Sequence, residues 1–112
     1  MNWIVILAAL SGAIAVAAGA FGAHGASGAA AEWLKTGAHY QLLHAVAALA
    51  VLRLDAKGPA WLFLAGGAIF GGTLYLMALG LPKWLGAITP IGGAMLIAGW
   101  LWLACIGLRT GQ

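Results

Sequence analysis

The sequence has very little charge. Only 6% of its 112 residues are Asp, Glu, Lys or Arg, whereas about a quarter of the residues of a soluble domain are charged. The hydrophobic fraction is 64% and the mean hydropathy is +1.04. These values exclude an ordinary water-soluble domain, and no hydrophilic stretch is long enough to fold separately. We therefore expect one membrane domain over residues 1–112, without a catalytic domain outside the bilayer.

Cysteines, clustered basic residues and catalytic motifs are also scarce. Cys105 is the only cysteine, so neither an intramolecular disulfide nor a cysteine-based metal site can form. The Lys and Arg residues are scattered, which excludes the basic patch that binds nucleic acids. The sequence contains no HExxH, no nucleophile elbow, no phosphate-binding loop and no CxxC. It predicts a protein that is not an enzyme.

Apolar stretches near the length of a membrane-spanning helix, about 20 residues, fill most of the chain. We predict four transmembrane helices with approximate crossings 3–21, 37–52, 60–81 and 85–108. The breaks carry charges, Gly and Pro, as in "RLDAKGP" and "GLPKW". The fold class is therefore an all-α four-helix membrane bundle with both termini on the same side. A one-residue excess of Lys and Arg on the side of the termini predicts that the termini are cytoplasmic.

Glycine is abundant, and its spacing predicts close helix packing. The chain has 18 glycines, and small residues let backbones approach where lipid supplies little hydrophobic drive for association. Gly67 and Gly71 form a GxxxG in the third crossing. The complete set of predicted packing glycines is Gly19, Gly22, Gly67, Gly71, Gly92 and Gly93.

The few polar side chains within the crossings form a candidate site. At helical spacing, Tyr40, Gln41 and His44 share one stripe of the second crossing. Because successive crossings alternate in direction, these positions and those of the other crossings are expected in one half of the membrane. The candidate ligand-binding or polar cluster comprises His24, Tyr40, Gln41, His44, Tyr75 and Thr89. His44 and Tyr75 fit a hydrogen-bonded network that holds the helices in register, and they fit a ligand site equally, because ionisable residues at such depth are functional by default. A position near the interface favours a structural role for Gln41 and Tyr40 and a headgroup contact for His24. Thr89 before Pro90 favours a helix N-cap.

Four motifs occur in a fixed order along the chain: "GAFGAHG", "TGxxYQxxH", "LYxxAL" and "TPIGG…GW". Together they resemble the YgdD family, small four-helix inner-membrane proteins that include a mitochondrial animal relative. The family pattern falls on Gly19, Phe21, Gly22, His24, Thr36, Gly37, Tyr40, Gln41, His44, Tyr75, Thr89, Pro90, Gly92 and Gly93. The chain departs at Gly71, where relatives often have a serine. The resemblance implies an inner-membrane location and a four-helix fold, and because the family is a domain of unknown function it implies no reaction.

Three functions remain open from the sequence. The first is a non-enzymatic accessory or scaffold protein that binds a membrane protein or a lipid, with a homo-oligomer as a further possibility. The second is a binder of a small hydrophobic ligand or cofactor, namely a quinone, haem or metal, through His44, His24, Tyr40 and Tyr75. The third is a small proton-coupled transporter that uses His44 as a relay. The sequence indicates no particular cofactor and no set of metal ligands. The lipid bilayer is the only partner that it indicates directly.

Overall fold

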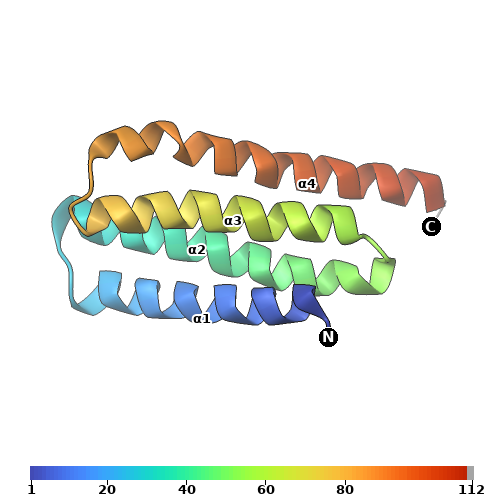
Figure 1. Cartoon of the computed structure of the whole chain (residues 1–112), viewed down its shortest axis with the longest axis horizontal. Coiled ribbons are helices and arrows are strands. Elements are labelled where there is room, and N and C mark those ends of the chain that lie inside the picture. Colours follow the sequence, from blue (N-terminus) through green and yellow to red (C-terminus); the bar gives the residue numbers. More distant parts are fainter. Residues whose placement is uncertain (111–112) are drawn as a thin grey trace.

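The computed structural model describes residues 1–110, which form a bundle of four long helices. The helices are α1 (Trp3–His24), α2 (Gly28–Ala50), α3 (Lys57–Ala78) and α4 (Thr89–Thr110), with short 3-10 helices η1 (Val51–Leu54) and η2 (Lys83–Ala87) before α3 and α4. α2 and α3 form the centre, and α1 and α4 lie on opposite sides of this pair (Figure 1). Because the helices alternate in direction, both chain ends lie at the same end of the bundle.

The start of α2 differs from the prediction. α1, α3 and α4 begin and end within a few residues of the predicted crossings 3–21, 60–81 and 85–108, but α2 begins at Gly28 rather than Gly37. The stretch between these two glycines is helical although it carries Glu32 and Lys35, whose side chains are exposed and lie 3.9 Å apart. Charge near Glu32 suggested a loop, whereas three consecutive alanines and the i,i+3 pair favour helix.

Within residues 1–110, three segments are long and apolar enough to cross a membrane by themselves: Trp3–His24, Lys57–Ala78 and Lys83–Thr110. α2 has a similar length but falls short of their hydropathy, since it contains Gln41, His44 and the charged residues near its start. α1 and α3 pack against it. Its polar side chains thereby exchange lipid for protein partners, which the hydrocarbon region requires.

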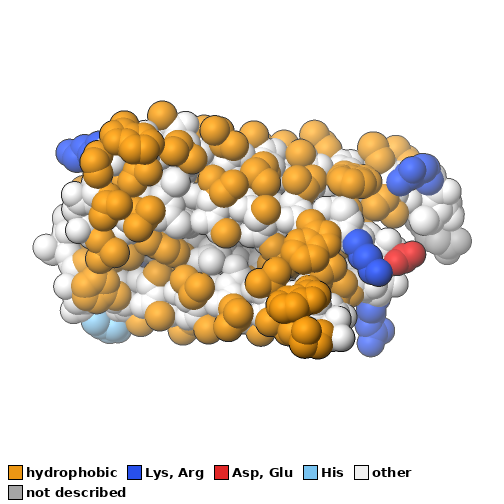
Figure 2. Space-filling view, viewed as in Figure 1, with side chains coloured by type: hydrophobic (Ala, Val, Ile, Leu, Met, Phe, Trp, Pro, Cys, Tyr) orange, Lys and Arg blue, Asp and Glu red, His pale blue; other side chains and the backbone are white. Residues whose placement is uncertain are grey.

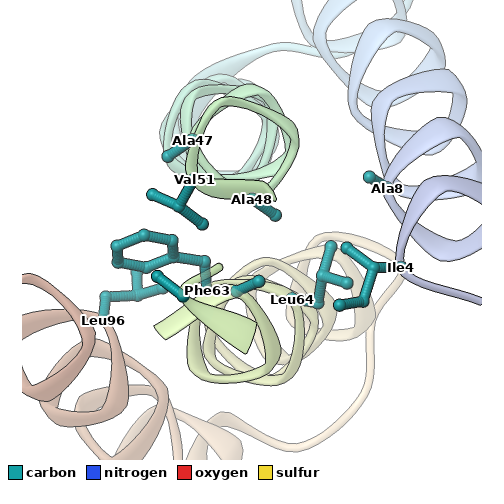
Figure 3. Close-up of a cluster of buried hydrophobic side chains, with 10 residues drawn as sticks. Ile4, Ala8, Ala47, Ala48, Val51, Phe63, Leu64 and Leu96 are labelled. Atoms are coloured by element: carbon teal, nitrogen blue, oxygen red, sulfur yellow. The ribbon is translucent and has the colours of Figure 1, made fainter. Parts of the chain in front are cut away.

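The apolar core lies in the half of the bundle that contains the termini. Phe63 of α3 is fully buried between Ala47 of α2, Val51 of η1 and Leu96 of α4 (Figure 3). On the other side of α2, Ile4 and Ala8 of α1 approach Leu64 of α3, as Figure 3 also shows. Small residues on α2 allow this close approach. The core therefore connects all four helices.

The outer surface of the bundle is apolar along its length. Figure 2 shows hydrophobic side chains over the flank and charged side chains at the two ends. Within the most apolar 18 residues of each segment, half of the residues of α3 are buried inside the protein. The buried share is only 17% in α1 and in the segment that contains α4. α1 and α4 therefore present most of their surface outward, as expected for helices that face lipid.

Candidate functional site

Gln41 connects three helices through its side chain. Its Oε1 accepts a hydrogen bond from the Tyr75 hydroxyl at 2.7 Å, and its Nε2 donates to Ser11 Oγ at 3.0 Å. Gly37 makes room for the tyrosine ring, because a Cβ there would lie 2.7 Å from Tyr75 Cε1. α1, α2 and α3 are thus joined by a chain of polar contacts in a region that offers no water.

His44 connects α2 to α4, and its two ring nitrogens are both engaged. Trp100 Nε1 lies 3.0 Å from His44 Nε2, and His44 Nδ1 lies 2.7 Å from the Tyr40 carbonyl oxygen. The indole N–H can only donate, so Nε2 must be the acceptor. The proton therefore resides on Nδ1, which donates to the carbonyl. The contacts select a neutral histidine in one tautomer.

A third contact joins the end of α3 to the start of α4. The hydroxyls of Thr73 and Thr89 lie 2.6 Å apart, and both side chains are buried. Thr73 Oγ1 also lies 2.9 Å from the Ile69 carbonyl oxygen, and Thr89 Oγ1 lies 3.3 Å from that of Leu85. One hydroxyl donates its proton to the other, and the hydroxyl that accepts can donate its own proton to its neighbouring carbonyl oxygen. The pair pins α4 to α3 beside η2.

The predicted polar residues do not gather in one half of the membrane. The backbone of Gln41 packs against Gly67, near the midpoint of α3, and Trp100 lies near the midpoint of α4. The Gln41 and His44 contacts are therefore close to the middle of the bundle. Tyr75, Thr89 and His24 do lie in the predicted half, toward the end with the 79–88 connection. The earlier start of α2 accounts for this correction, since it adds helix before Tyr40, Gln41 and His44.

His24 and Tyr40 differ from the other candidates. His24 is exposed in the last turn of α1 and makes no side-chain hydrogen bond within residues 1–110. The Tyr40 side chain is 42% exposed; its ring packs on Phe70 with centroids 4.8 Å apart and stacks nearly parallel to His44 at 6.4 Å. Four of the six candidate side chains, those of Gln41, Tyr75, His44 and Thr89, thus take part in three separate inter-helix contacts. His24 lies outside these contacts, and Tyr40 lies at a surface.

Sequence reasoning missed three residues that complete these contacts: Ser11, Thr73 and Trp100. The signal for Trp100 was available, because a tryptophan N–H deep in an apolar helix requires an acceptor and His44 is a suitable one. Ser11 lies within the apolar first crossing and was not among the predicted polar residues. Its hydroxyl is the acceptor that the amide of Gln41 needs.

The predicted packing glycines contribute unequally. A Cβ on Gly92 would lie 2.5 Å from the Phe70 backbone nitrogen, and one on Gly22 would lie 2.9 Å from Leu34 Cβ. Gly19 and Gly71 are tight, with nearest atoms at 3.3 Å and 3.2 Å, whereas Gly67 and Gly93 have only ordinary contacts. Gly66, which was not predicted, faces the Gly92 carbonyl oxygen, so the α3–α4 crossing is a contact between backbones.

Two lateral grooves open onto the outer surface. One of about 410 Å³ lies between α1 and α3, with Ser11 and Gln41 among its lining residues. The other, of about 550 Å³, lies between α2 and α4 over Phe70 of α3 and is called here the α2–α4 groove. Its lining includes Tyr40, His44, Phe70, Leu96, Ile97 and Trp100. No group of three His, Cys, Asp or Glu side chains within the described chain is arranged to hold a metal ion.

The comparisons with known proteins agree on one family. The family described as "Protein of unknown function (DUF423)" matches residues 18–93. The UPF0382 membrane protein SAB0533 of Staphylococcus aureus is 39% identical, covering 92% of this chain and 93% of the relative. The UPF0382 inner membrane protein YgdD of Escherichia coli K12 is also 39% identical, covering 88% of this chain and 84% of the relative. No solved structure matches the chain.

The matched region extends from the end of α1 to the first turn of α4, so it contains Gln41, His44, Tyr75 and Thr89. The resemblance that the motifs indicated is confirmed, as are the helical membrane fold and the multi-pass inner-membrane location. The chain therefore belongs to the DUF423 (UPF0382) family of YgdD-like membrane proteins.

Proposed function

We propose that this protein is a non-enzymatic accessory or scaffold protein of the membrane, which binds another membrane protein or a lipid through its outer helices. One observation carries the proposal. The buried polar side chains bind one another: Gln41 is held by Tyr75 and Ser11, and His44 by Trp100 and Tyr40. Among the described residues, no buried side-chain nitrogen or oxygen lacks a partner. Polar side chains that bind one another in this way favour a structural role.

The hydrogen bonds of His44 disfavour the metal and haem alternatives. A histidine binds a metal through a nitrogen lone pair, and the lone pair on Nε2 accepts the Trp100 N–H. The other nitrogen carries its proton toward the Tyr40 carbonyl oxygen. A metal would have to displace the Trp100 indole from Nε2. His24, the other predicted histidine ligand, lies at the end of α1 and so is not beside His44.

The transporter alternative needs His44 to take up and release protons. Protonation of Nε2 would set two N–H donors, those of His44 and Trp100, against each other. The half of the bundle beyond His44 is filled by Phe63, Val51 and the alanines of the core. A proton relay would therefore have to break the Trp100 contact and open this apolar core, which supports the scaffold.

The outer faces supply the binding surface in this proposal. α1 and α4 are largely unburied within the chain, and small exposed residues such as Ala13 and Ala98 leave room for close approach by another helix. Transmembrane helices associate through packing of such small-residue faces. The partner is thus a membrane-embedded helix or a lipid; a second copy of the chain is one such helix.

The test is gentle purification of tagged protein from its own membrane, followed by native mass spectrometry. We expect a protein or lipid partner at fixed stoichiometry. Ala13→Phe places a bulky side chain on the outer face of α1, and Ala98→Phe does the same on α4. We expect the substitution on the helix that binds the partner to release it. The substitution on the other helix is then the matched control and should leave the partner bound. Retention by a folded His44→Phe variant would support the scaffold.

Two results would contradict the proposal. One is a bare monomer under every mild detergent tried, with neither protein nor lipid at fixed stoichiometry. The other is a bound metal or haem that disappears in a folded His44→Ala variant, because that result would make His44 a ligand rather than a structural residue.

A further inference from the structure

Two hollows between α1 and α3 meet at Trp61. The first, of about 440 Å³, lies at the end of the bundle that carries the termini and is lined by Lys57; it is called here the Lys57 pocket. The second is the groove of about 410 Å³ described above, called here the α1–α3 groove. Trp61 lines both, so together they form one seam from the end of the bundle toward its middle. Figure 2 shows Lys and Arg side chains beside hydrophobic side chains at this end.

The polar side chains of the Lys57 pocket offer hydrogen-bond donors. Lys57 is exposed and forms no ion pair in the described part of the chain. Asn2 uses its Oδ1 to accept the Val5 N–H at 3.2 Å, which leaves its Nδ2 to donate. Trp3 and Trp61 are exposed, and their indole N–H groups can only donate. A cation surrounded by donors calls for a ligand with oxygen acceptors and negative charge.

Among the described residues, no carboxylate lines the Lys57 pocket. Asp55 is close in sequence, but it lines a separate pocket beside α4 together with Arg53. Glu32 lies near the start of α2, at the opposite end of the bundle. A lysine is a point charge that suits a phosphate group, whereas an ammonium group would find no carboxylate here. The pocket therefore favours an anionic headgroup over a zwitterionic one.

The length of the seam matches one leaflet of a bilayer. On α1 its lining residues run from Ile4 to Ile14, which is about 15 Å at 1.5 Å per residue. The hydrocarbon core is about 30 Å thick, so the seam spans about half of it. A partner helix would need a face along the full thickness, whereas an acyl chain of a phospholipid ends at the middle of the bilayer.

The wall of the α1–α3 groove suits a hydrocarbon chain. Its apolar lining includes Leu7, Ile14 and Ala68. The two polar residues that reach it, Ser11 and Gln41, are hydrogen-bonded to each other at 3.0 Å. They therefore need no polar group from a ligand. The seam thus combines a polar, cationic end at the interface with an apolar groove beneath it, which is the division of an amphiphile.

We propose that the seam between α1 and α3 binds one anionic phospholipid, with its headgroup phosphate at Lys57 and one acyl chain in the α1–α3 groove. Trp3 and Trp61 lie at headgroup level, where such aromatic side chains are common, and basic pockets between transmembrane helices bind anionic headgroups. The inference rests on the proposed function, because it gives the lipid of that proposal a chemical class and a site. A lipid that merely surrounds the bundle needs neither Lys57 nor the groove.

The test is titration of the delipidated full chain in dodecyl maltoside with dioleoylphosphatidylglycerol, followed by native mass spectrometry. We expect one tightly bound lipid per chain and weaker binding of zwitterionic dioleoylphosphatidylcholine. Lys57→Gln should weaken phosphatidylglycerol binding about fivefold, the worth of one lysine near an anionic surface, and Lys57→Arg should preserve it. Lys83→Gln is the matched control, because Lys83 is exposed beside Trp84 at the opposite end of the bundle, and it should bind like the wild type.

A second pair of variants tests the acyl-chain half of the site. Ala65 is exposed and lines the α1–α3 groove, so Ala65→Phe should fill the groove and abolish binding. Ala94→Phe is the matched control, because Ala94 is exposed on α4, on the other side of the α2–α3 pair (Figure 1). If Ala65→Phe does not fold by circular dichroism, Ala68→Phe tests the same blockage, since Ala68 is also exposed at the groove.

Each contrary result overturns a stated part of the inference. Equal binding of the two lipids, or an equal loss in Lys57→Gln and Lys83→Gln, removes the anionic headgroup site. Unchanged binding in folded Ala65→Phe and Ala68→Phe removes the acyl chain from the groove, and displacement of the lipid by sn-glycerol 3-phosphate would make the ligand a soluble phosphate ester. A protein that co-purifies at fixed stoichiometry, while phosphatidylglycerol binds without preference, would overturn this inference alone and leave the scaffold proposal standing.

Discussion

Trp100 Nε1 donates a hydrogen bond to His44 Nε2 over 3.0 Å, and this contact joins α4 to α2 near the middle of the bundle. α4 otherwise packs mainly on α3. The contact couples two helices that are separated by the α2–α4 groove. It also decides the tautomer of the histidine, because the indole can only donate.

A double-mutant cycle on this pair measures the coupling. We expect Trp100→Phe and His44→Leu each to lower the free energy of unfolding, and their combination to cost less than the sum. The interaction should be about 0.6–1.7 kcal/mol, the range found for hydrogen bonds between membrane helices. Reversible unfolding in mixed micelles, followed by circular dichroism, gives the four values. Strict additivity would mean that the hydrogen bond contributes nothing.

Adjacent glycines in α4 should respond oppositely to alanine. Gly92→Ala places a Cβ 2.5 Å from the Phe70 backbone nitrogen and 2.8 Å from the Gly66 carbonyl oxygen, so the α3–α4 crossing must open. We expect a loss of about 1–3 kcal/mol, as for overpacked cores. Gly93→Ala has only ordinary contacts and gains up to about 1 kcal/mol from helix propensity. Thermal melts of both variants in the same detergent make the comparison, and equal behaviour would contradict a contact between backbones at this crossing.

Gln41 should depend on both of its partners. Tyr75→Phe removes the donor to Gln41 Oε1, and Ser11→Ala removes the acceptor of its Nε2. Each should destabilise the bundle by about 0.5–1.5 kcal/mol, the net worth of a hydrogen bond. Gln41→Leu removes the polar group that binds both partners. In a Gln41→Leu background, Ser11→Ala should therefore leave the free energy of unfolding nearly unchanged. A Ser11→Ala cost that persists in the Gln41→Leu background would show that the serine acts elsewhere.

The distribution of Lys and Arg predicts that the termini are cytoplasmic, and labelling tests this prediction. In a Cys105→Ala background, Ser27→Cys should react in intact cells with a maleimide that does not cross the membrane, and Asp55→Cys should react only after lysis. The two positions lie in connections at opposite ends of the bundle. The reverse pattern would place the termini outside the cytoplasm, and equal labelling would contradict the alternating crossings.

Much of the fold was predictable from hydrophobicity alone. α1, α3 and α4 are apolar along nearly their whole length, so their positions follow from the cost of exposing backbone groups to lipid. The start of α2 was not predictable in this way. Glu32 and Lys35 lower the hydropathy of a segment that is helical, because hydropathy reports partition into lipid and not backbone conformation.

The candidate site was predictable in its residue types and not in its connections. Gln41, His44 and Tyr75 were singled out because polar groups at depth need partners, and the structure provides partners for each. Which partner each one finds depends on the rotation of every helix and on the offset between neighbours. Gln41 and His44 are neighbours on α2, as residues three positions apart on a helix are, but they bind different helices. Gln41 contacts Ser11 of α1 and Tyr75 of α3, whereas His44 contacts Trp100 of α4.

The amino-acid sequence by itself determined a helical membrane protein, the glycines that allow close crossings and the polar residues that must be satisfied inside it. Only the tertiary structure decided that Trp100 donates a hydrogen bond to His44 and that Ser11 accepts one from Gln41. It alone also decided that Tyr40 lies beside a groove. The physical reason is the range of the interactions. Transfer into lipid is a property of each segment, whereas a hydrogen bond about 3 Å long between two helices exists only after their packing has fixed both ends.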